Sequence, residues 1–185
     1  GEMPEIYNLI GLSYEMLNNK LEAISNFEKS LELNPKSLSA LVNLGNNYKD
    51  LKNYNKSEEF YKKLISIDAN YLKAYGNYGN LLRMKNDYAG AIKQYQTGIS
   101  IYEKQGKQVN NIQLFYYNLA LAYQSMGNFK DTIEQANIVL KFDPKFTRAD
   151  HLISACKKYQ SPEDPHILEM EHKLNNLKLS EFGKI

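Results

Sequence analysis

The chain is short of the residues from which disulfide frameworks and membrane spans are built. Its 185 residues include one cysteine, Cys156, and no tryptophan. A single cysteine excludes an intramolecular disulfide and favours a reducing compartment, so we expect a cytoplasmic protein. No run of about 18 apolar residues occurs, so the sequence predicts no transmembrane helix and no membrane partner.

An excess of one charge sign is also lacking. Lys and Arg total 23 against 21 for Asp and Glu, which gives a net charge of +2. The largest local excess lies in residues 72–112, with six basic and two acidic residues. A nucleic-acid interface needs a denser stripe of Lys and Arg, so we expect no nucleic-acid partner. Neighbouring carboxylates such as Glu58 and Glu59 are interpreted as a solvated helix face.

Catalytic and metal-binding patterns are equally scarce. Two of the three histidines, His166 and His172, stand six residues apart, about 120° from a shared helical face. That spacing is poor for a metal pair, and His151 and Cys156 lack a carboxylate at a useful spacing. No phosphate-binding glycine loop with a Lys-Ser/Thr pair occurs. We therefore expect no catalytic residue, no cofactor and no metal within this chain.

What the chain does contain is an internal repeat. Four segments align with a period of 34 residues, interrupted once: Pro4–Ser37, Leu38–Tyr71, Leu72–Gln105 and Gln113–Phe146. Within each segment, apolar and aromatic residues recur at helical spacing, which predicts two helices per segment. The eighth position is always small: Gly11, Gly45, Gly79 and Ala120. A small residue there lets the two helices of a segment approach closely.

This pattern resembles the tetratricopeptide repeat, a helix–turn–helix unit that stacks into a right-handed solenoid. The resemblance implies an all-α fold, an α-solenoid of about four repeats over residues 4–146 followed by capping helices. The turns between paired helices carry Asn18-Asn19, Lys52-Asn53, Asn86-Asp87 and Gly127-Asn128. Asn and Gly tolerate the left-handed conformation that ends a helix, and Asn or Asp can cap the next helix.

The period slips once, between the third and fourth repeats. Gln113 lies 41 residues after Leu72, so seven residues, 106–112, are inserted. Seven residues are two helical turns, so we expect a longer second helix in the third repeat, a longer first helix in the fourth, or both. Gly106 and the pair Asn110-Asn111 mark a connection within the insertion.

Both ends of the chain fall outside the four repeats. Residues 1–3 resemble the remnant of a cleaved purification tag. In residues 147–185 we expect a capping helix over Thr147–Tyr159 and an amphipathic helix over His166–Leu177. The packing face of the second helix would be formed by Ile167, Met170, Leu174 and Leu177. The sequence stops near the start of a further helix, so we expect the native polypeptide to continue.

In the tetratricopeptide family, the first helices of the repeats line a concave groove that faces the ligand. The positions that face the groove supply six candidate peptide-binding residues here: Asn43, Asn77, Asn118, Asn46, Asn80 and Lys73. The first three resemble the asparagine ladder of O-linked N-acetylglucosamine transferases, which implies a grip on an extended peptide backbone. A carboxamide offers one acceptor and two donors, which match the C=O and N–H of a peptide unit. A compositional bias toward asparagine is the alternative explanation.

Another binding mode of this family is a carboxylate clamp for the C-termini of chaperones. Lys73 and Asn43 match that clamp, whereas Asn8, Leu12 and Asn77 do not, so we do not expect it. The asparagine ladder also weakens toward the N-terminus, because Leu9 occupies the corresponding position of the first repeat.

The tail resembles the connection in bacterial tetratricopeptide proteins that are fused to a sulfotransferase domain. The similar stretches are Asp164–Ile167, Met170–Glu171, Leu174, Leu177–Ser180 and Lys184–Ile185. The resemblance implies a C-terminal catalytic domain, outside this chain, that would use the sulfate donor PAPS.

Two functions remain open from the sequence. The first is a non-catalytic scaffold that holds a protein or extended peptide in its groove, as the substrate-presenting part of a larger transferase. The second is a structural or dimerisation region of a sulfotransferase or glycosyltransferase, with the groove unused. The oligomeric state and the sequence of the partner are not specified by any pattern in the chain.

Overall fold

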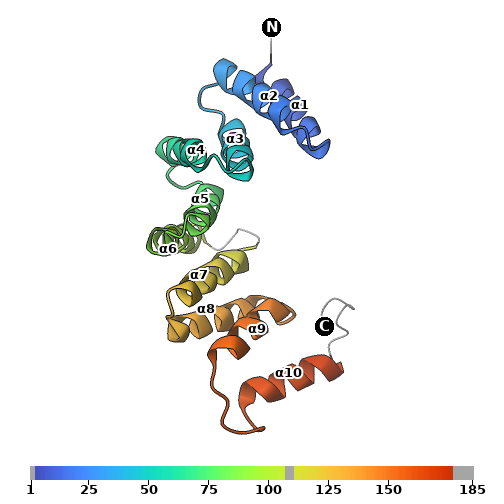
Figure 1. Cartoon of the computed structure of the whole chain (residues 1–185), viewed down its shortest axis with the longest axis vertical. Helices are drawn as coiled ribbons and strands as arrows, with labels where there is room; N and C mark the ends of the chain where they lie inside the picture. Colours follow the sequence, from blue (N-terminus) through green and yellow to red (C-terminus); the bar gives the residue numbers. More distant parts are fainter. Residues whose placement is uncertain (1–2, 107–110, 177–185) are drawn as a thin grey trace. The chain divides into compact units, whose positions relative to one another are not determined.

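The computed structural model describes residues 3–106 and 111–176, and these residues form ten α-helices and no strand. The helices are α1 (Pro4–Met16), α2 (Lys20–Leu33), α3 (Leu38–Asp50), α4 (Tyr54–Ile67), α5 (Leu72–Met84), α6 (Tyr88–Lys104), α7 (Gln113–Ser125), α8 (Phe129–Phe142), α9 (Thr147–Cys156) and α10 (Pro165–Asn176) (Figure 1). The chain divides into two compact units, Gly1–Ile101 and Tyr102–Ile185.

In the first unit, helices pack in consecutive pairs, α1 with α2 and α3 with α4, and each pair stacks on the next through its second helix. One core cluster joins α2 to α3 and consists of Ala23, Ile24, Phe27, Leu44 and Tyr48. A second joins α3, α4 and α5 through Leu41, Leu64 and Ala74. In the second unit, α7 pairs with α8, and α9 packs on α8 through Ala149, Leu152 and Ile153.

Each helix pair of the first unit closes on a contact between a glycine and an aromatic ring. A β-carbon built on Gly45 would lie 2.5 Å from Cε1 of Tyr61, and the same distance separates Gly11 from Phe27 and Gly79 from Tyr95. All three rings are fully buried. In the fourth repeat the ring is replaced by Ala136, and the eighth position is Ala120. The small eighth position is thus required wherever the second helix presents a ring.

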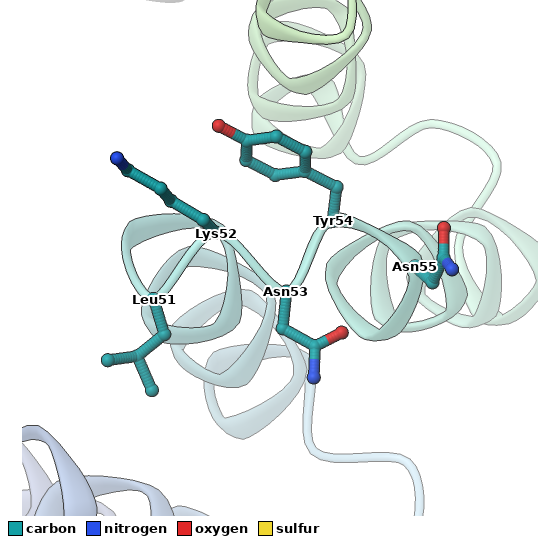
Figure 2. Close-up of a pocket in the computed structure, with 5 residues that line it drawn as sticks. All are labelled: Leu51, Lys52, Asn53, Tyr54 and Asn55. Atoms are coloured by element: carbon teal, nitrogen blue, oxygen red, sulfur yellow. The ribbon is translucent and has the colours of Figure 1, made fainter.

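The turns inside the helix pairs have the predicted conformation. Backbone φ is positive at Asn18, Lys52, Asn86 and Gly127 (57°, 60°, 62° and 73°). The following residue caps the next helix in every case, with its side chain accepting from a backbone N–H: Asn19 from Glu22, Asn53 from Lys56, Asp87 from Gly90 and Asn128 from Asp131. Figure 2 shows the second turn, where Lys52 and Tyr54 project to one side and Leu51 and Asn53 to the other. A shallow surface pocket at this turn is lined by Leu51–Asn55.

The helix before the insertion, α6, is longer than the other second helices, and the helix after it is not. α6 has 17 residues, whereas α2, α4 and α8 have 14 each. α7 keeps the 13 residues of the other first helices. The connection that follows α6 contains Gly106 and Asn111, both with positive φ, while Asn110 lies outside the described residues.

The structure corrects two expectations about the C-terminal helices. α9 ends at Cys156, short of the predicted Tyr159. The predicted packing face of α10 was also wrong by one residue, because Leu174 is 61% exposed whereas Lys173 is buried. The buried face of α10 therefore runs through His166, Met170 and Lys173, for a reason that lies in α9 and is described below. Leu177, the last residue of the predicted face, lies outside the described residues.

The interpretation of Glu58 as a solvated carboxylate was also wrong. Its side chain, 19% exposed, pairs with Lys62 of α4 at 2.8 Å and with Lys85 at the end of α5 at 2.5 Å. It also accepts a hydrogen bond of 3.0 Å from the hydroxyl of Tyr78. The hydrogen bonds from Lys62 and Lys85 lower the pKa of Glu58 from 4.5 to about 2. Glu58 therefore helps to hold the second repeat against the third.

We predict that Gly45→Ala destabilises the chain by about 1–3 kcal/mol, because the new methyl group overlaps a ring that cannot move. The change should be measured by urea denaturation, alone and in a Tyr61→Leu background, where the overlapping ring atoms are gone. In that background Gly45→Ala should cost nothing or stabilise slightly, because alanine favours the helix by about 1 kcal/mol. An equal cost in both backgrounds would contradict the steric explanation.

We predict that Glu58 makes the chain acid-sensitive. Because its folded pKa is depressed, its contribution to stability is complete above pH 4.5 and is lost progressively as the pH falls toward about 2. Glu58→Gln should cost about 1 kcal/mol at neutral pH, since the lysine partners are partly exposed, and should flatten the dependence of stability on pH in this window. Glu59→Gln, a change at the exposed neighbouring residue, is the control and should alter neither.

Candidate functional site

Five of the six predicted site residues lie in one unit. Asn43 and Asn46 belong to α3, and Lys73, Asn77 and Asn80 belong to α5, all within Gly1–Ile101. The four carboxamides are half-buried, and Lys73 is exposed. Asn118, on α7, is also half-buried but belongs to the unit Tyr102–Ile185.

Asn46 and Asn80 are engaged by tyrosines of the second helices. The hydroxyl of Tyr61 donates to Oδ1 of Asn46 at 2.7 Å, and that of Tyr95 donates to Oδ1 of Asn80 at 2.8 Å. Burial raises the pKa of both phenols, that of Tyr95 to about 12. A buried hydroxyl needs an acceptor, so each asparagine serves the core with its oxygen and keeps its amide N–H donors.

The residue at the position of Asn46 and Asn80 varies from repeat to repeat with the ring that faces it. The first repeat has Phe27, which lacks a hydroxyl, and Leu12 replaces the asparagine; the fourth has Ala136, and Leu121 replaces it. Asparagine occurs at this position only opposite a tyrosine. Its first role is therefore to satisfy the hydroxyl, and any contact with a ligand comes through its amide nitrogen.

Asn43 contacts the first helix of the preceding repeat. Its Nδ2 donates to Oδ1 of Asn8 at 3.0 Å. Asn47, one turn further along α3, is fully buried and donates both to Oε1 of Glu15 at 2.8 Å and to the backbone oxygen of Asn43 at 2.9 Å. Asn47 was not among the predicted site residues. The sequence has two consecutive asparagines, Asn46 and Asn47, where the repeat pattern places a buried side chain.

Asn77 and Asn118 differ from the other asparagines. Neither side chain forms a hydrogen bond with any residue that the structure describes, although both are half-buried. Lys73, one turn before Asn77, has no carboxylate partner within the same described ranges. The surface of α5 therefore presents a cation and a carboxamide whose hydrogen-bonding capacity is unused by the protein.

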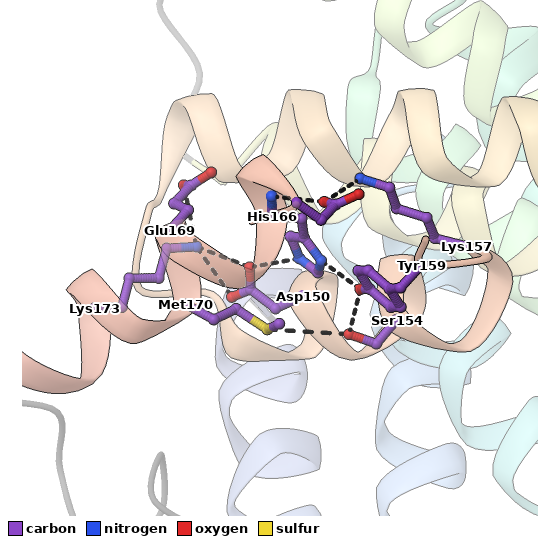
Figure 3. A network of polar contacts seen from close by, with 9 residues as sticks. Asp150, Ser154, Lys157, Tyr159, His166, Glu169, Met170 and Lys173 are labelled. Atoms are coloured by element: carbon purple, nitrogen blue, oxygen red, sulfur yellow. Dashed lines mark hydrogen bonds and ion pairs between the residues drawn. The ribbon is translucent and has the colours of Figure 1, made fainter. Parts of the chain in front are cut away.

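A second cluster of polar residues joins α9 to α10 (Figure 3). Nζ of Lys173 lies 2.8 Å and 3.1 Å from the two carboxylate oxygens of Asp150, and both side chains are buried. Nε2 of His166 lies 3.4 Å from Oδ1 of Asp150. Nδ1 of His166 shares a hydrogen bond of 2.6 Å with the hydroxyl of Tyr159. These contacts explain why Lys173 and not Leu174 faces inward.

This polar cluster holds α10 in place. Nζ of Lys173 also lies 3.4 Å from Oε1 of Glu169, which lines a surface pocket together with Asn137, Leu140 and Lys141. The sequence carried half of the signal for the cluster, since Asp150 stands on the apolar face of α9, whereas the apolar spacing of α10 pointed to Leu174 and not to Lys173.

Metal sites and membrane spans are the two remaining classes of site, considered over residues 3–106 and 111–176. No group of three or more His, Cys, Asp or Glu side chains is arranged to hold a metal ion in these ranges. No helix in the same part of the chain combines the length and hydropathy that a membrane span requires.

Comparison with known families identifies the repeats. Three family models, each described as tetratricopeptide repeat, match residues 4–37, 36–104 and 115–146. Together they cover more than two thirds of the chain, which therefore belongs to the tetratricopeptide-repeat proteins. The predicted all-α fold class is confirmed. Proteins of this family are generally scaffolds that bind other proteins or peptides, and this chain is a protein-interaction scaffold of that type.

Individual similar proteins differ widely. The MamA protein, known from a crystal structure, is 26% identical, with a TM-score of 0.76 over 96% of both chains. YrrB, described as a TPR protein with an unusual peptide-binding site, is 16% identical, with a TM-score of 0.67 over 89% of this chain and 81% of its own. At that identity YrrB shows the fold alone.

Among curated proteins, the general transcriptional corepressor trfA of Dictyostelium discoideum is 23% identical over 138 residues, which are 75% of this chain and 10% of trfA. The chain spans about a tenth of the length of the curated relatives that it matches over most of its residues.

We predict that Lys173→Met costs about 3–5 kcal/mol in the docking of α10, because it leaves the carboxylate of Asp150 buried without its ammonium partner. Hydrogen exchange should then accelerate in α9 and α10 and stay unchanged in α3 and α4. Adding Asp150→Asn should restore part of the protection, since the orphaned charge is removed. His172→Met, at the exposed neighbouring residue, serves as the control. If Lys173→Met alone leaves hydrogen exchange in α9 and α10 as slow as His172→Met does, the structural role of Lys173 is contradicted.

Proposed function

We propose that the chain is a non-catalytic scaffold that binds an extended peptide along the first helices of its repeats. The candidate residues in one unit are Asn43, Asn46, Asn77, Asn80 and Lys73, and the candidate in the other is Asn118. The observation that carries the proposal is the half-buried carboxamide of Asn77, which has no partner among the described residues. A half-buried carboxamide without a protein partner is hydrogen-bonded to water, and the C=O and N–H of a peptide backbone can replace that water.

The other asparagines add donors to the same surface. Asn43 uses one N–H for Asn8, and Asn46 and Asn80 use their oxygens for the tyrosine hydroxyls. Each keeps at least one amide N–H that can donate to a peptide carbonyl. Because the buried tyrosines fix Asn46 and Asn80 in position, little side-chain entropy is lost when a peptide binds. Such contacts bind an extended chain without selecting its side chains.

The second candidate function is a packing or dimerisation surface in a larger transferase, and one observation favours it. Ile10 of α1 is 38% exposed, whereas Leu44, the equivalent residue of α3, is fully buried under α2. Leu17 and Leu21, each 75% exposed, extend the apolar surface of the first repeat. The resemblance of the tail to sulfotransferase fusions stays a prediction, and from Leu177 onward it falls outside the described residues.

The peptide-binding proposal is tested with a phage-displayed library of random unstructured peptides panned against the intact chain. Binders should be recovered, and Asn77→Ala combined with Asn43→Ala should weaken them by roughly tenfold to thirtyfold, at about 1 kcal/mol for each lost hydrogen bond. Asn118→Ala tests the other unit separately. Asn55→Ala, on the exposed surface of α4, is the matched control and should leave binding unchanged.

Circular dichroism should show that every variant keeps its helix content. Failure to recover any binder, or binding that survives the triple change at Asn43, Asn77 and Asn118, would overturn the proposal and favour the packing surface. In that case substitution of Ile10 and Leu17 by serine should change the oligomeric state, as measured by sedimentation.

A further inference from the structure

Carboxylates are scarce on the first helices α3, α5 and α7. The first helices α3, α5 and α7 contain three basic residues, Lys49, Lys73 and Arg83. Their only acidic residue, Asp50, is paired with Lys20 of α2 at 2.6 Å. The second helices α2, α4, α6 and α8 carry both signs, eight carboxylates and nine lysines, and the first helix α1 carries Glu5 and Glu15 without a cation. The first helices from α3 onward therefore present positive charge without exposed unpaired carboxylates.

The cations on these helices are available to a ligand. Lys49 and Lys73 have no ion-pair partner within the ranges that the structure describes. Lys73 is exposed and precedes the unpartnered Asn77 by one helical turn. Arg83 is different, because it lies close enough to Tyr95 to lower the pKa of that phenol against the effect of burial. Lys73 is thus the cation of this unit best placed beside the candidate peptide site.

The unit Tyr102–Ile185 holds a cation that is positioned more firmly. The guanidinium of Arg148, at the second residue of α9, lies 5.0 Å from the ring centre of Phe146 and 5.6 Å from that of Tyr117. The two rings contact each other edge to face, with centroids 5.0 Å apart, and pack against the core of α7, α8 and α9. Arg148 is exposed and makes no ion pair or hydrogen bond with the described residues.

This arrangement favours carboxylates as ligands. The guanidinium lies within cation–π distance of two rings and is exposed, so its N–H fork is accessible to a carboxylate. The only acidic residue of α9, Asp150, is buried and neutralised by Lys173, so it does not compete. Asn118 follows Tyr117 in α7 and adds an unpartnered carboxamide to the same surface. The cations are few and spaced apart, which fits side-chain carboxylates better than a nucleic-acid backbone.

We infer that each unit, taken by itself, prefers an acidic peptide: Arg148, held on Tyr117 and Phe146, takes an Asp or Glu side chain in the unit Tyr102–Ile185, and Lys73, beside Asn77, takes one in the unit Gly1–Ile101. The inference rests on the proposed function, because the carboxamides hold the backbone while the cations select the side chains. It adds specificity to a surface that would otherwise bind any extended chain.

The test uses the intact chain and three fluorescein-labelled 12-residue peptides of alternating sequence: Glu-Ser, Gln-Ser and Lys-Ser. Fluorescence anisotropy at 50 mM salt should show that the Glu-Ser peptide binds about tenfold more tightly than the Gln-Ser peptide, with the Lys-Ser peptide weakest. Arg148→Gln should weaken the Glu-Ser peptide about tenfold and leave the Gln-Ser peptide unchanged. Arg148→Lys should restore part of the loss, since it keeps the charge and loses the fork.

Lys130→Gln is the matched control, because it removes the same charge from an exposed residue of the second helix α8. If Glu-Ser and Gln-Ser peptides bind equally and Asn77→Ala weakens both, the proposed peptide binding stands and the preference for acid is wrong. Equal losses from Lys130→Gln and Arg148→Gln would show attraction by overall charge and overturn the inference. Equal competition by a thymidine oligonucleotide, or no binding of the Glu-Ser peptide, would overturn it as well.

Discussion

The structure depends on the close approach of two helices where a glycine of the first meets an aromatic ring of the second. Gly11, Gly45 and Gly79 each leave room for one ring, and a β-carbon at any of them would lie within 2.5 Å of it. This contact sets the spacing of the helix pair. In the second and third repeats it also brings the hydroxyl of the ring to the outer surface of the first helix, where it meets Asn46 or Asn80. The core contact therefore determines which side chains the surface presents.

One residue type serves three purposes on these helices. Asn46 and Asn80 accept from buried tyrosines, Asn43 and Asn47 link α3 to α1, and Asn77 and Asn118 have no partner among the described residues. The sequence pattern treated most of them as one ladder because spacing alone carries no information on hydrogen-bond partners. The partners come from other helices, and in the case of Asn46 the partner is Tyr61, fifteen residues later. Only the asparagines that remain unpartnered retain their full capacity for a ligand.

The period predicted the helices, the turns and the capping residues, because these depend on local conformation. At each turn a residue that tolerates positive φ precedes one that caps the next helix, and both are read directly from neighbouring positions. The face of α10 was not predicted, since it depends on Asp150, a charge on another helix that draws Lys173 inward. The role of Glu58 was missed for the same reason, because its partners Tyr78 and Lys85 belong to the next repeat. Spacing predicts elements, whereas ion pairs across elements require both surfaces to be known.

Two carboxylates of second helices contribute to the way the repeats stack. Glu28 of α2 accepts from Tyr48 of α3 at 2.8 Å, and Glu58 of α4 accepts from Tyr78 of α5 at 3.0 Å. In both cases a carboxylate of a second helix satisfies a hydroxyl from the first helix of the following repeat. Stacking thus uses carboxylates where second helices meet their neighbours, and it requires none on the opposite surface of the first helices. Lys49 and Lys73 have no carboxylate partner among the described residues, so they keep their charge available on this surface.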